Sequence, residues 1–299
     1  MAIYLDNGKK TVKVPTLFRF VQWTTAILVL LLTGALVLAH MYSPMRWDED
    51  FAQAGCVRKN TCFCEFVNND SFCRQPSNAY SSLSFAFVGV WMLFKAGQRM
   101  EFDGKVNKLQ LFNMFVMSAI SIILGIGSYL YHATLTMFGE TGDALGMHFI
   151  GTFIAVFSFA RLLRAIASKI KIKMSVHGTF ALIFYPLFAL LIFANVMKQN
   201  WGKLSWYKLG VEIATVFIAE LIISALNRTP PPKELVMAAS AFAFSFIVWF
   251  LDKEHIWCDP HSVMQGHALW HLGLSISVLT LFLLYSKQKR VYILHSSSV

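Results

Sequence analysis

The sequence predicts an all-α fold, a polytopic transmembrane helical bundle. Of its 299 residues, 56% are hydrophobic and only 14% are charged, whereas an ordinary soluble domain carries about a quarter charged residues. The apolar residues come in blocks of about twenty, the length at which a helix crosses the roughly 30 Å hydrocarbon core of a bilayer. The 27 Phe and only five Cys also exclude a disordered chain and a disulfide-dense small domain.

Eight apolar segments are expected to cross the membrane, separated by charged residues, Pro or Gly. The first of them, which follows four basic residues, has a cleaved signal peptide as its alternative interpretation. Its apolar run has no clear small-x-small cleavage site before the next polar loop, which favours an uncleaved anchor helix. The predicted spans are 20–41, 78–98, 111–131, 144–165, 178–197, 206–226, 234–251 and 264–286.

The basic residues predict how the chain is oriented. Of the 26 Lys and Arg, 18 fall in the terminal segments and alternate loops on one side of the predicted membrane, and eight fall on the other. The more basic side is normally cytosolic, so both termini are expected in the cytosol. Because the basic residues lie in short loops, the net charge of +10 predicts no nucleic-acid partner. Endoplasmic reticulum or Golgi of a eukaryote and inner membrane of a bacterium fit equally, and the oligomeric state stays open.

All five cysteines fall on the side that this orientation makes non-cytosolic. Such segregation predicts at least one structural disulfide in an oxidising compartment, and the odd number leaves one thiol free or paired between chains. A zinc knuckle at Cys62-x-Cys64 is a weaker alternative, because structural zinc sites usually have about two to four residues between paired cysteines. The five are Cys56, Cys62, Cys64, Cys73 and Cys258.

Polar side chains at the ends of three spans predict a functional site, because ionisable groups are costly inside a membrane. Ser128 and His132 close the third span and, being four residues apart, share a helix face. Asp143 opens the fourth span. His267 and His271, also four apart, open the last span. The predicted topology brings all five to the non-cytosolic ends of their helices.

The histidines predict a metal site. A His-x3-His pair on a helix is a good chelate for a transition metal, and imidazole suits zinc. A third imidazole from His132 would complete three protein ligands and leave one position for water, as in catalytic zinc sites. The alternatives are that His132 is an interfacial residue, that Ser128 bonds to its own backbone and that Asp143 caps a helix. His148 is a reserve ligand on a different helix face.

The order of these residues resembles the alkaline ceramidase family. That family belongs to a superfamily of seven-helix membrane hydrolases that also includes adiponectin-receptor-like and GPI-lipid remodelling proteins. The resemblance rests on Ser128-x3-His132, Asp143 eleven residues later and His267-Ala268-Leu269-Trp270-His271, within residues 64–286. It implies a seven-helix hydrolase core. The additional N-terminal transmembrane helix at 20–41 departs from the family and gives this chain eight predicted spans instead of seven. The expected divisions are a cytosolic N-terminus with an accessory anchor helix (1–41), a Cys-containing non-cytosolic loop (42–77), the catalytic core (78–286) and a cytosolic tail (287–299).

The resemblance also implies a reaction. Zinc would be bound by His132, His267 and His271, with Ser128 and Asp143 as catalytic residues beside it. The expected substrate is ceramide, whose amide bond would be cleaved to a sphingoid base and a fatty acid. The alternatives are a zinc-dependent lipid esterase or GPI-lipid remodelling hydrolase, and a receptor or transporter without hydrolytic activity.

Two further features of the family concern the first loop. The family's Cys-Glu element implies a disulfide between Cys64 and Cys258. Two of the three remaining cysteines could form one further disulfide. The family's acidic calcium site implies Glu65 as a ligand, with oxygen donors from the Asn68, Asn69 and Asp70 run. Gln75 stands where a second Glu is expected, which argues against calcium regulation.

Overall fold

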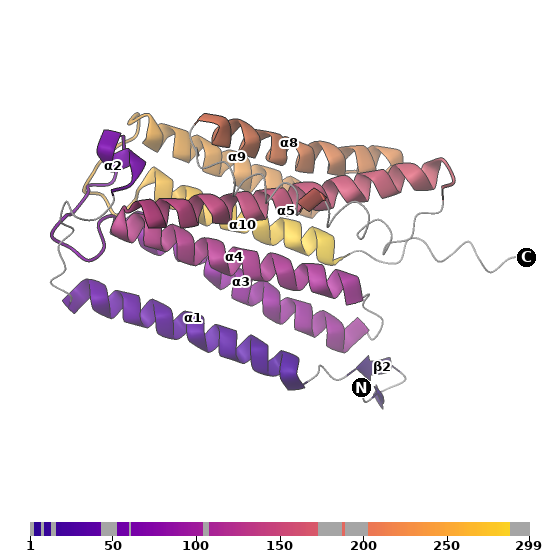
Figure 1. The fold of residues 1–299 in the computed structure, drawn as a ribbon. Coiled ribbons are helices and arrows are strands. Elements are labelled where there is room, and N and C mark those ends of the chain that lie inside the picture. The colour runs from indigo at the N-terminus through magenta and orange to yellow at the C-terminus, as the bar shows by residue number, and fades with distance from the viewer. Residues whose placement is uncertain are drawn as a thin grey trace, which may run out of the picture.

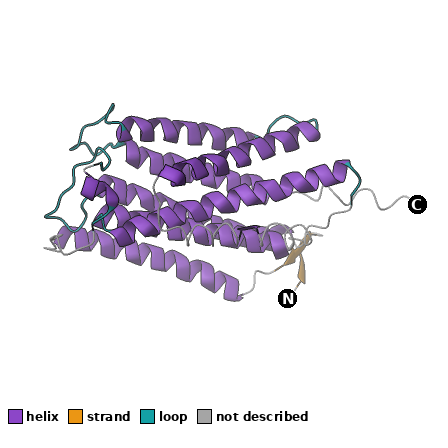
Figure 2. Ribbon diagram, turned by 45° about the horizontal axis from the view of Figure 1, so that its top comes forward, coloured by secondary structure: helices purple, strands orange, loops and turns teal. Residues whose placement is uncertain are grey.

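The computed structural model describes residues 3–6, 9–12, 16–42, 53–59, 61–103, 108–172, 187–188 and 203–287. In this part of the chain, long helices lie side by side as a bundle (Figures 1 and 2). Seven of them are long and apolar enough to cross a membrane, which confirms a polytopic helical bundle. The described elements are β1 (Ile3–Asp6), β2 (Lys9–Val12), α1 (Thr16–Tyr42), α2 (Gly55–Lys59), α3 (Pro76–Asp103), α4 (Lys108–Thr134), α5 (Met137–Lys169), α8 (Lys203–Leu226), α9 (Lys233–Lys253) and α10 (Gly266–Ser286).

The long helices match seven of the eight predicted spans. The predicted span 178–197 lies outside the described residues, apart from 187–188. The main difference is α5, which begins at Met137, seven residues before the predicted start. Its N-cap is Thr136, whose hydroxyl accepts a hydrogen bond from the Gly139 N–H at 3.3 Å. With 33 residues, α5 is about 50 Å long and extends beyond the hydrocarbon core of a bilayer.

A tight turn between α4 and α5 fixes how these two helices meet. Only Leu135 and Thr136 join them, and Leu135 has a left-handed backbone with φ of 49°. Farther along, a Cβ at Gly127 would lie 2.9 Å from the carbonyl oxygen of Gly142, so only glycine permits this approach. The last turns of α4, with Ser128 and His132, therefore pack directly on the first turns of α5.

The remaining contacts close the bundle. α3 packs on α4, α5 packs on α8, and α10 packs on both α9 and α3. α10 and α5 are the most enclosed helices, with 67% and 61% of their most apolar windows buried. The hydrophobic core that several helices share includes Phe85 of α3, Leu124 of α4, Phe153 of α5 and Phe282 of α10. The last span is thus central, which places its two N-terminal histidines inside the protein.

α1 lies outside this core. It packs against α3, and only 6% of its most apolar window is buried, as expected for a helix that faces lipid on most sides. A buried amide anchors it, because Gln22 donates to the Leu93 carbonyl oxygen at 2.8 Å, and such polar contacts hold helices together in membranes. This arrangement fits the expected accessory helix, while the expected domain boundaries stay a prediction.

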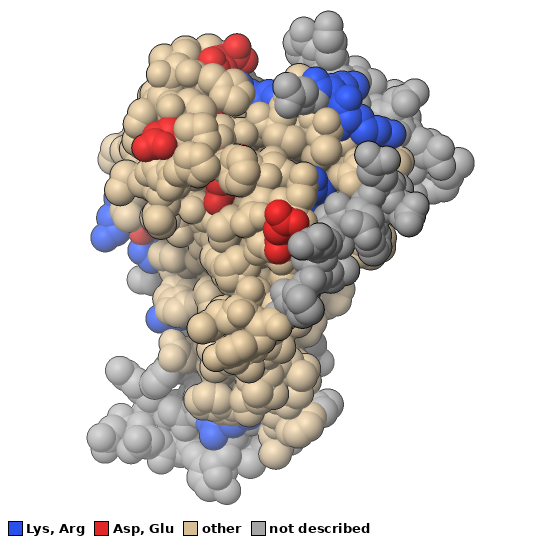
Figure 3. Space-filling view, turned by 90° about the vertical axis from the view of Figure 1, so that its left-hand side faces the viewer, with Lys and Arg blue, Asp and Glu red and all other residues tan. Residues whose placement is uncertain are grey.

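The two ends of the bundle differ. The antiparallel hairpin of β1 and β2, which we did not predict, lies at the same end as the C-terminal end of α10 (Figure 1). α2 and the loops that carry the cysteines lie at the opposite end. Figure 3 views this opposite end, whose described surface is mostly uncharged with scattered charged side chains.

Candidate metal centre and active site

Three histidines converge at the end of the bundle that carries the cysteines. His132 comes from the last turn of α4, and His267 and His271 come from the first two turns of α10. All three are buried, and one ring nitrogen of each lies within 4.8 Å of the others. The Nε2 atoms of His132 and His267 are 3.1 Å apart. Two nitrogens on one tetrahedral zinc are about 3.3 Å apart when each lies about 2.0–2.1 Å from the ion, so this donor set fits zinc.

An outer hydrogen bond orients the His132 ring. Its Nδ1 lies 3.1 Å from Oε1 of Gln75. The Gln75 amide is itself oriented, because its Nε2 donates to the carbonyl oxygen of Glu65 at 3.1 Å. Gln75 Oε1 therefore accepts from Nδ1–H of His132, which leaves the Nε2 lone pair for a metal, as outer partners of metal-bound histidines do.

Ser81 does the same for His271. Its hydroxyl donates to the Asn78 carbonyl oxygen at 3.0 Å, and its Oγ lies 2.9 Å from Nδ1 of His271. Since the hydroxyl proton points at Asn78, Oγ accepts from Nδ1–H of His271. The other ring nitrogen, Nε2, faces Ser128 Oγ at 3.5 Å. Neither Gln75 nor Ser81 was predicted to support the site, although both stand beside the polar start of the second predicted span.

A cavity of about 190 Å³ adjoins the histidines. Its polar lining includes Ser128, Asp143, His267 and His271, and Oγ of Ser128 lies 3.5 Å from Nε2 of His271. The cavity thus combines a polar end with apolar walls, as sites for lipid-like ligands do. The apolar wall includes Phe63, Phe85, Leu124, Met147, Trp249, Trp270 and Leu274.

Asp143 does not open a helix, contrary to the prediction. It lies within the second turn of α5, and Thr136 holds the N-cap position, so the alternative that Asp143 is a capping residue is wrong. A residue distant in the sequence stabilises the preceding turn, because the Glu140 carboxylate accepts from the N–H of Gly55, the first residue of α2, at 2.7 Å. Asp143, one turn further along α5, lines the cavity.

His148 lies deeper in α5 and also lines the cavity. Its Nδ1 is 3.8 Å from a carboxylate oxygen of Glu212 on α8. It does not join the three-histidine group. The expected reserve ligand therefore belongs to a separate polar contact between α5 and α8.

One disulfide lies within the first loop and a second joins this loop to the loop between α9 and α10. Cys64 is joined to Cys258, and Cys56 is joined to Cys62, so the zinc-knuckle alternative is wrong. Cys73 is free and buried. Burial raises the pKa of the Cys73 thiol to about 12, so this thiol stays protonated and unreactive at neutral pH.

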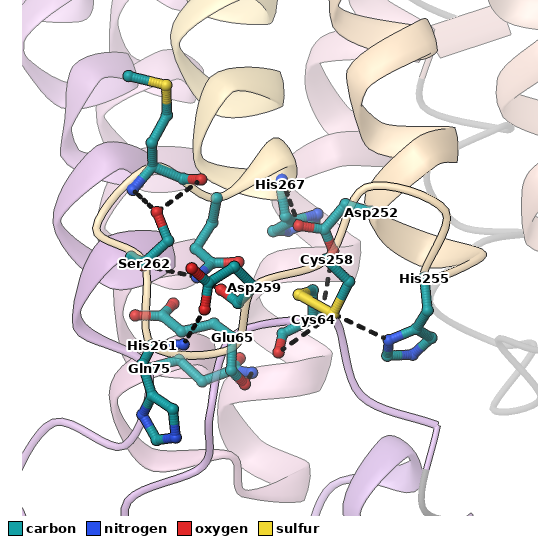
Figure 4. The surroundings of a disulfide bond; sticks show 12 residues. Cys64, Glu65, Gln75, Asp252, His255, Cys258, Asp259, His261, Ser262 and His267 are labelled. Carbon is teal, nitrogen blue, oxygen red and sulfur yellow. Dashed lines mark hydrogen bonds between the residues drawn. A yellow bond between two sulfur atoms is a disulfide. The ribbon is translucent and has the colours of Figure 1, made fainter.

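Asp252 connects the Cys64–Cys258 disulfide to the group of three histidines. Its buried carboxylate accepts from the backbone N–H of Cys64 and from that of His267, each at 3.0 Å (Figure 4). The second of these bonds satisfies an otherwise unpaired donor in the first turn of α10. Asp252 was not predicted either, although a carboxylate at the end of a span is a signal that could have found it.

Glu65 has a different role from the expected calcium ligand. Its two carboxylate oxygens accept from the backbone N–H groups of Ser77 and Asn78, at 2.6 and 2.9 Å, and so cap the start of α3. Asn68 Oδ1 accepts from the Asp70 N–H at 3.0 Å. Calcium binding by Glu65, Asn68 and Asp70 stays a prediction that these hydrogen bonds do not favour.

The disulfide between Cys64 and Cys258 can be tested by substituting each cysteine. Cys64→Ser and Cys258→Ser should each cause the same change in non-reducing gel mobility, because each opens the same 194-residue loop. Cys73→Ser is the matched control and should leave the mobility unchanged. Different mobilities for the first two variants would contradict the pairing.

Comparisons with known proteins identify the family of this chain. A family model described as Ceramidase matches residues 62–293. The chain is 26% identical over 235 residues to a Dictyostelium discoideum protein named "Putative alkaline ceramidase dcd3A", covering 69% of this chain and 78% of that protein. It is also 26% identical over 165 residues to the alkaline ceramidase of Caenorhabditis elegans, covering 54% of this chain and 58% of that protein. Because the family model spans most of the chain, the protein belongs to the ceramidase family.

Proposed function

We propose that the protein is a zinc-dependent intramembrane amidohydrolase that cleaves ceramide to a sphingoid base and a fatty acid. The observation that carries this proposal is the convergence of three buried imidazoles at the polar end of an apolar cavity, beside Ser128 and Asp143. Membership of the ceramidase family and the names of the similar proteins support ceramide as the substrate.

The residues that would hold zinc are His132, His267 and His271. When bound, zinc supplies a Lewis acid for the amide carbonyl and lowers the pKa of a water molecule towards neutrality. The protein prepares this site in advance, because Gln75 and Ser81 hold Nδ1–H of His132 and His271 and leave each Nε2 free to coordinate. Neutral imidazoles also leave the full charge of the ion available to polarise the substrate.

Asp143 would act as general base and general acid, and Ser128 would act as a hydrogen-bond donor to the oxyanion. The Asp143 carboxylate accepts a proton from the attacking water and returns it to the amide nitrogen as the C–N bond breaks. Ser128 donates its hydroxyl hydrogen bond to the oxyanion that develops on the carbonyl oxygen. The water oxygen becomes part of the fatty acid, and one proton leaves with the amine. The apolar wall of the cavity excludes bulk water and packs against the hydrocarbon chains.

The experiment that tests the function combines elemental analysis of detergent-purified protein with a lipid panel. We expect about one zinc per chain and chelator-sensitive release of fatty acid from ceramides, but not from phospholipids or GPI-type lipids. Zinc with ester cleavage would favour the lipid esterase or GPI-lipid remodelling alternative. Folded protein with neither bound metal nor turnover would contradict the proposal and favour a receptor or transporter.

We also propose that the site faces the non-cytosolic side and that both termini are cytosolic. The support is that the histidines and both disulfides lie at one end of the bundle, and structural disulfides require an oxidising compartment. Non-reducing gel mobility of the protein taken from its native membrane tests this orientation. Fully reduced Cys64 and Cys258 there would contradict it.

A further inference from the structure

We propose that Phe63 is a positioning residue that holds the His267 ring in its metal-binding orientation. The inference rests on the proposed zinc site. It concerns His267, whose ring is held in place differently from the rings of the other two histidines. His132 is oriented by Gln75, and His271 is oriented by Ser81. Within the described residues, Nδ1 of His267 is buried and has no hydrogen-bond partner.

An aromatic stack replaces that hydrogen bond. The rings of Phe63 and His267 have centroids 3.5 Å apart and planes inclined by only 22°. The Phe63 ring also contacts His132, at a centroid distance of 5.9 Å. A ring lying flat on His267 opposes rotation of the imidazole about its Cβ–Cγ bond, because this rotation would drive an edge of the imidazole into the face of Phe63. Nε2 of His267 is therefore kept towards Nε2 of His132.

The backbone around Phe63 is fixed on both sides. Its neighbour Cys62 is bonded to Cys56, and its other neighbour Cys64 is bonded to Cys258. The Asp252 carboxylate accepts from the N–H of Cys64 and from the N–H of His267. The backbone next to Phe63 and the backbone of His267 are therefore bonded to the same side chain.

The two disulfides also tie Phe63 to separate parts of the bundle. Cys56 belongs to α2, whose first residue, Gly55, donates to Glu140 on α5. Cys258 lies in the loop between α9 and α10. Phe63 lines the cavity, and it therefore closes the metal centre from the loop side while holding His267.

The test compares Phe63→Ala with Phe66→Ala. Phe66 lies in the same loop, is exposed and contacts His261, which is outside the metal centre. The readout is zinc retained by the purified protein against a graded series of chelator concentrations. We expect Phe63→Ala to bind zinc about tenfold more weakly than the parent, in the range found when outer support of a metal ligand is removed. Phe66→Ala should bind zinc as the parent does.

Two further substitutions separate stacking from simple filling of space. Phe63→Tyr should retain the parent affinity for zinc because it keeps the aromatic face, whereas Phe63→Leu should lose affinity nearly as Phe63→Ala does. If Phe63→Ala fails to fold, the comparison of Phe63→Leu with Phe63→Tyr decides the question. A double Cys56→Ser, Cys62→Ser variant, which releases one side of Phe63, should lose zinc to the chelator faster than the parent.

Equal zinc affinity in the parent, Phe63→Leu and Phe66→Ala would overturn the role of Phe63 and leave the zinc site intact. Absence of zinc from the folded parent would instead overturn the proposed function itself. The two failures are thus distinguished by the parent protein in the same titration.

Discussion

His267→Ala is expected to lose both the bound zinc and the hydrolytic activity. Within the described residues, His132, His267 and His271 form the only group of three histidines close enough to hold one ion. Two imidazoles are fewer than the three protein ligands of catalytic zinc sites. We expect kcat/KM to fall by at least about 10³-fold, which corresponds to about 4 kcal/mol of transition-state stabilisation. His271→Ala should behave in the same way.

The measurement pairs zinc content with fatty-acid release from ceramide for each variant. His261→Ala is the matched control, because His261 is exposed in the loop before α10 and contacts Phe66 instead of the metal centre. Full activity of His267→Ala would refute the zinc assignment. Full zinc content with no activity would mean that His267 acts on the substrate without being a required ligand.

The spans could be predicted because burial in a bilayer demands long apolar blocks, and such blocks are visible in one sequence. The start of α5 at Met137 could not be predicted in this way. Residues 137–143 include Gly139, Glu140 and Gly142, which resemble a loop when taken alone. In the structure they form helix behind the Thr136 N-cap, and Glu140 accepts a hydrogen bond from the N–H of Gly55, 85 residues earlier. A contact at this separation leaves no trace in the local pattern.

The candidate site can be predicted to the extent that it depends on spacing within a helix. A separation of four residues is enough to place Ser128 with His132 and His267 with His271 on shared helix faces. The supports of these residues depend instead on packing between helices and loops. Gln75 stands out in the sequence only as a departure from a calcium site, yet it bridges Glu65 and His132. Its role depends on how the start of α3 meets the end of α4, which spacing along the chain does not encode.

Asp143→Asn is expected to keep most of the zinc and lose turnover. Asn has the shape of Asp and keeps a side-chain oxygen that accepts hydrogen bonds, so the substitution should leave the packing around the three histidines unchanged. The amide is not a base at neutral pH, however, so it cannot take the proton of the attacking water. General acid–base groups typically contribute 10²–10⁴-fold to rate, and we expect turnover to fall by about that factor. Steady-state kinetics with ceramide, alongside zinc analysis, measures both effects.

The two readouts of this variant distinguish three roles for Asp143. Retained zinc with lost turnover is the result expected of a proton acceptor. Loss of zinc would make Asp143 a ligand, and the site would then hold a carboxylate whose negative charge offsets part of the charge on the ion. Retained turnover would show that another group takes the proton. Asp259→Asn is the control, because Asp259 is exposed and accepts from the His261 N–H outside the cavity, so it should change neither zinc content nor turnover.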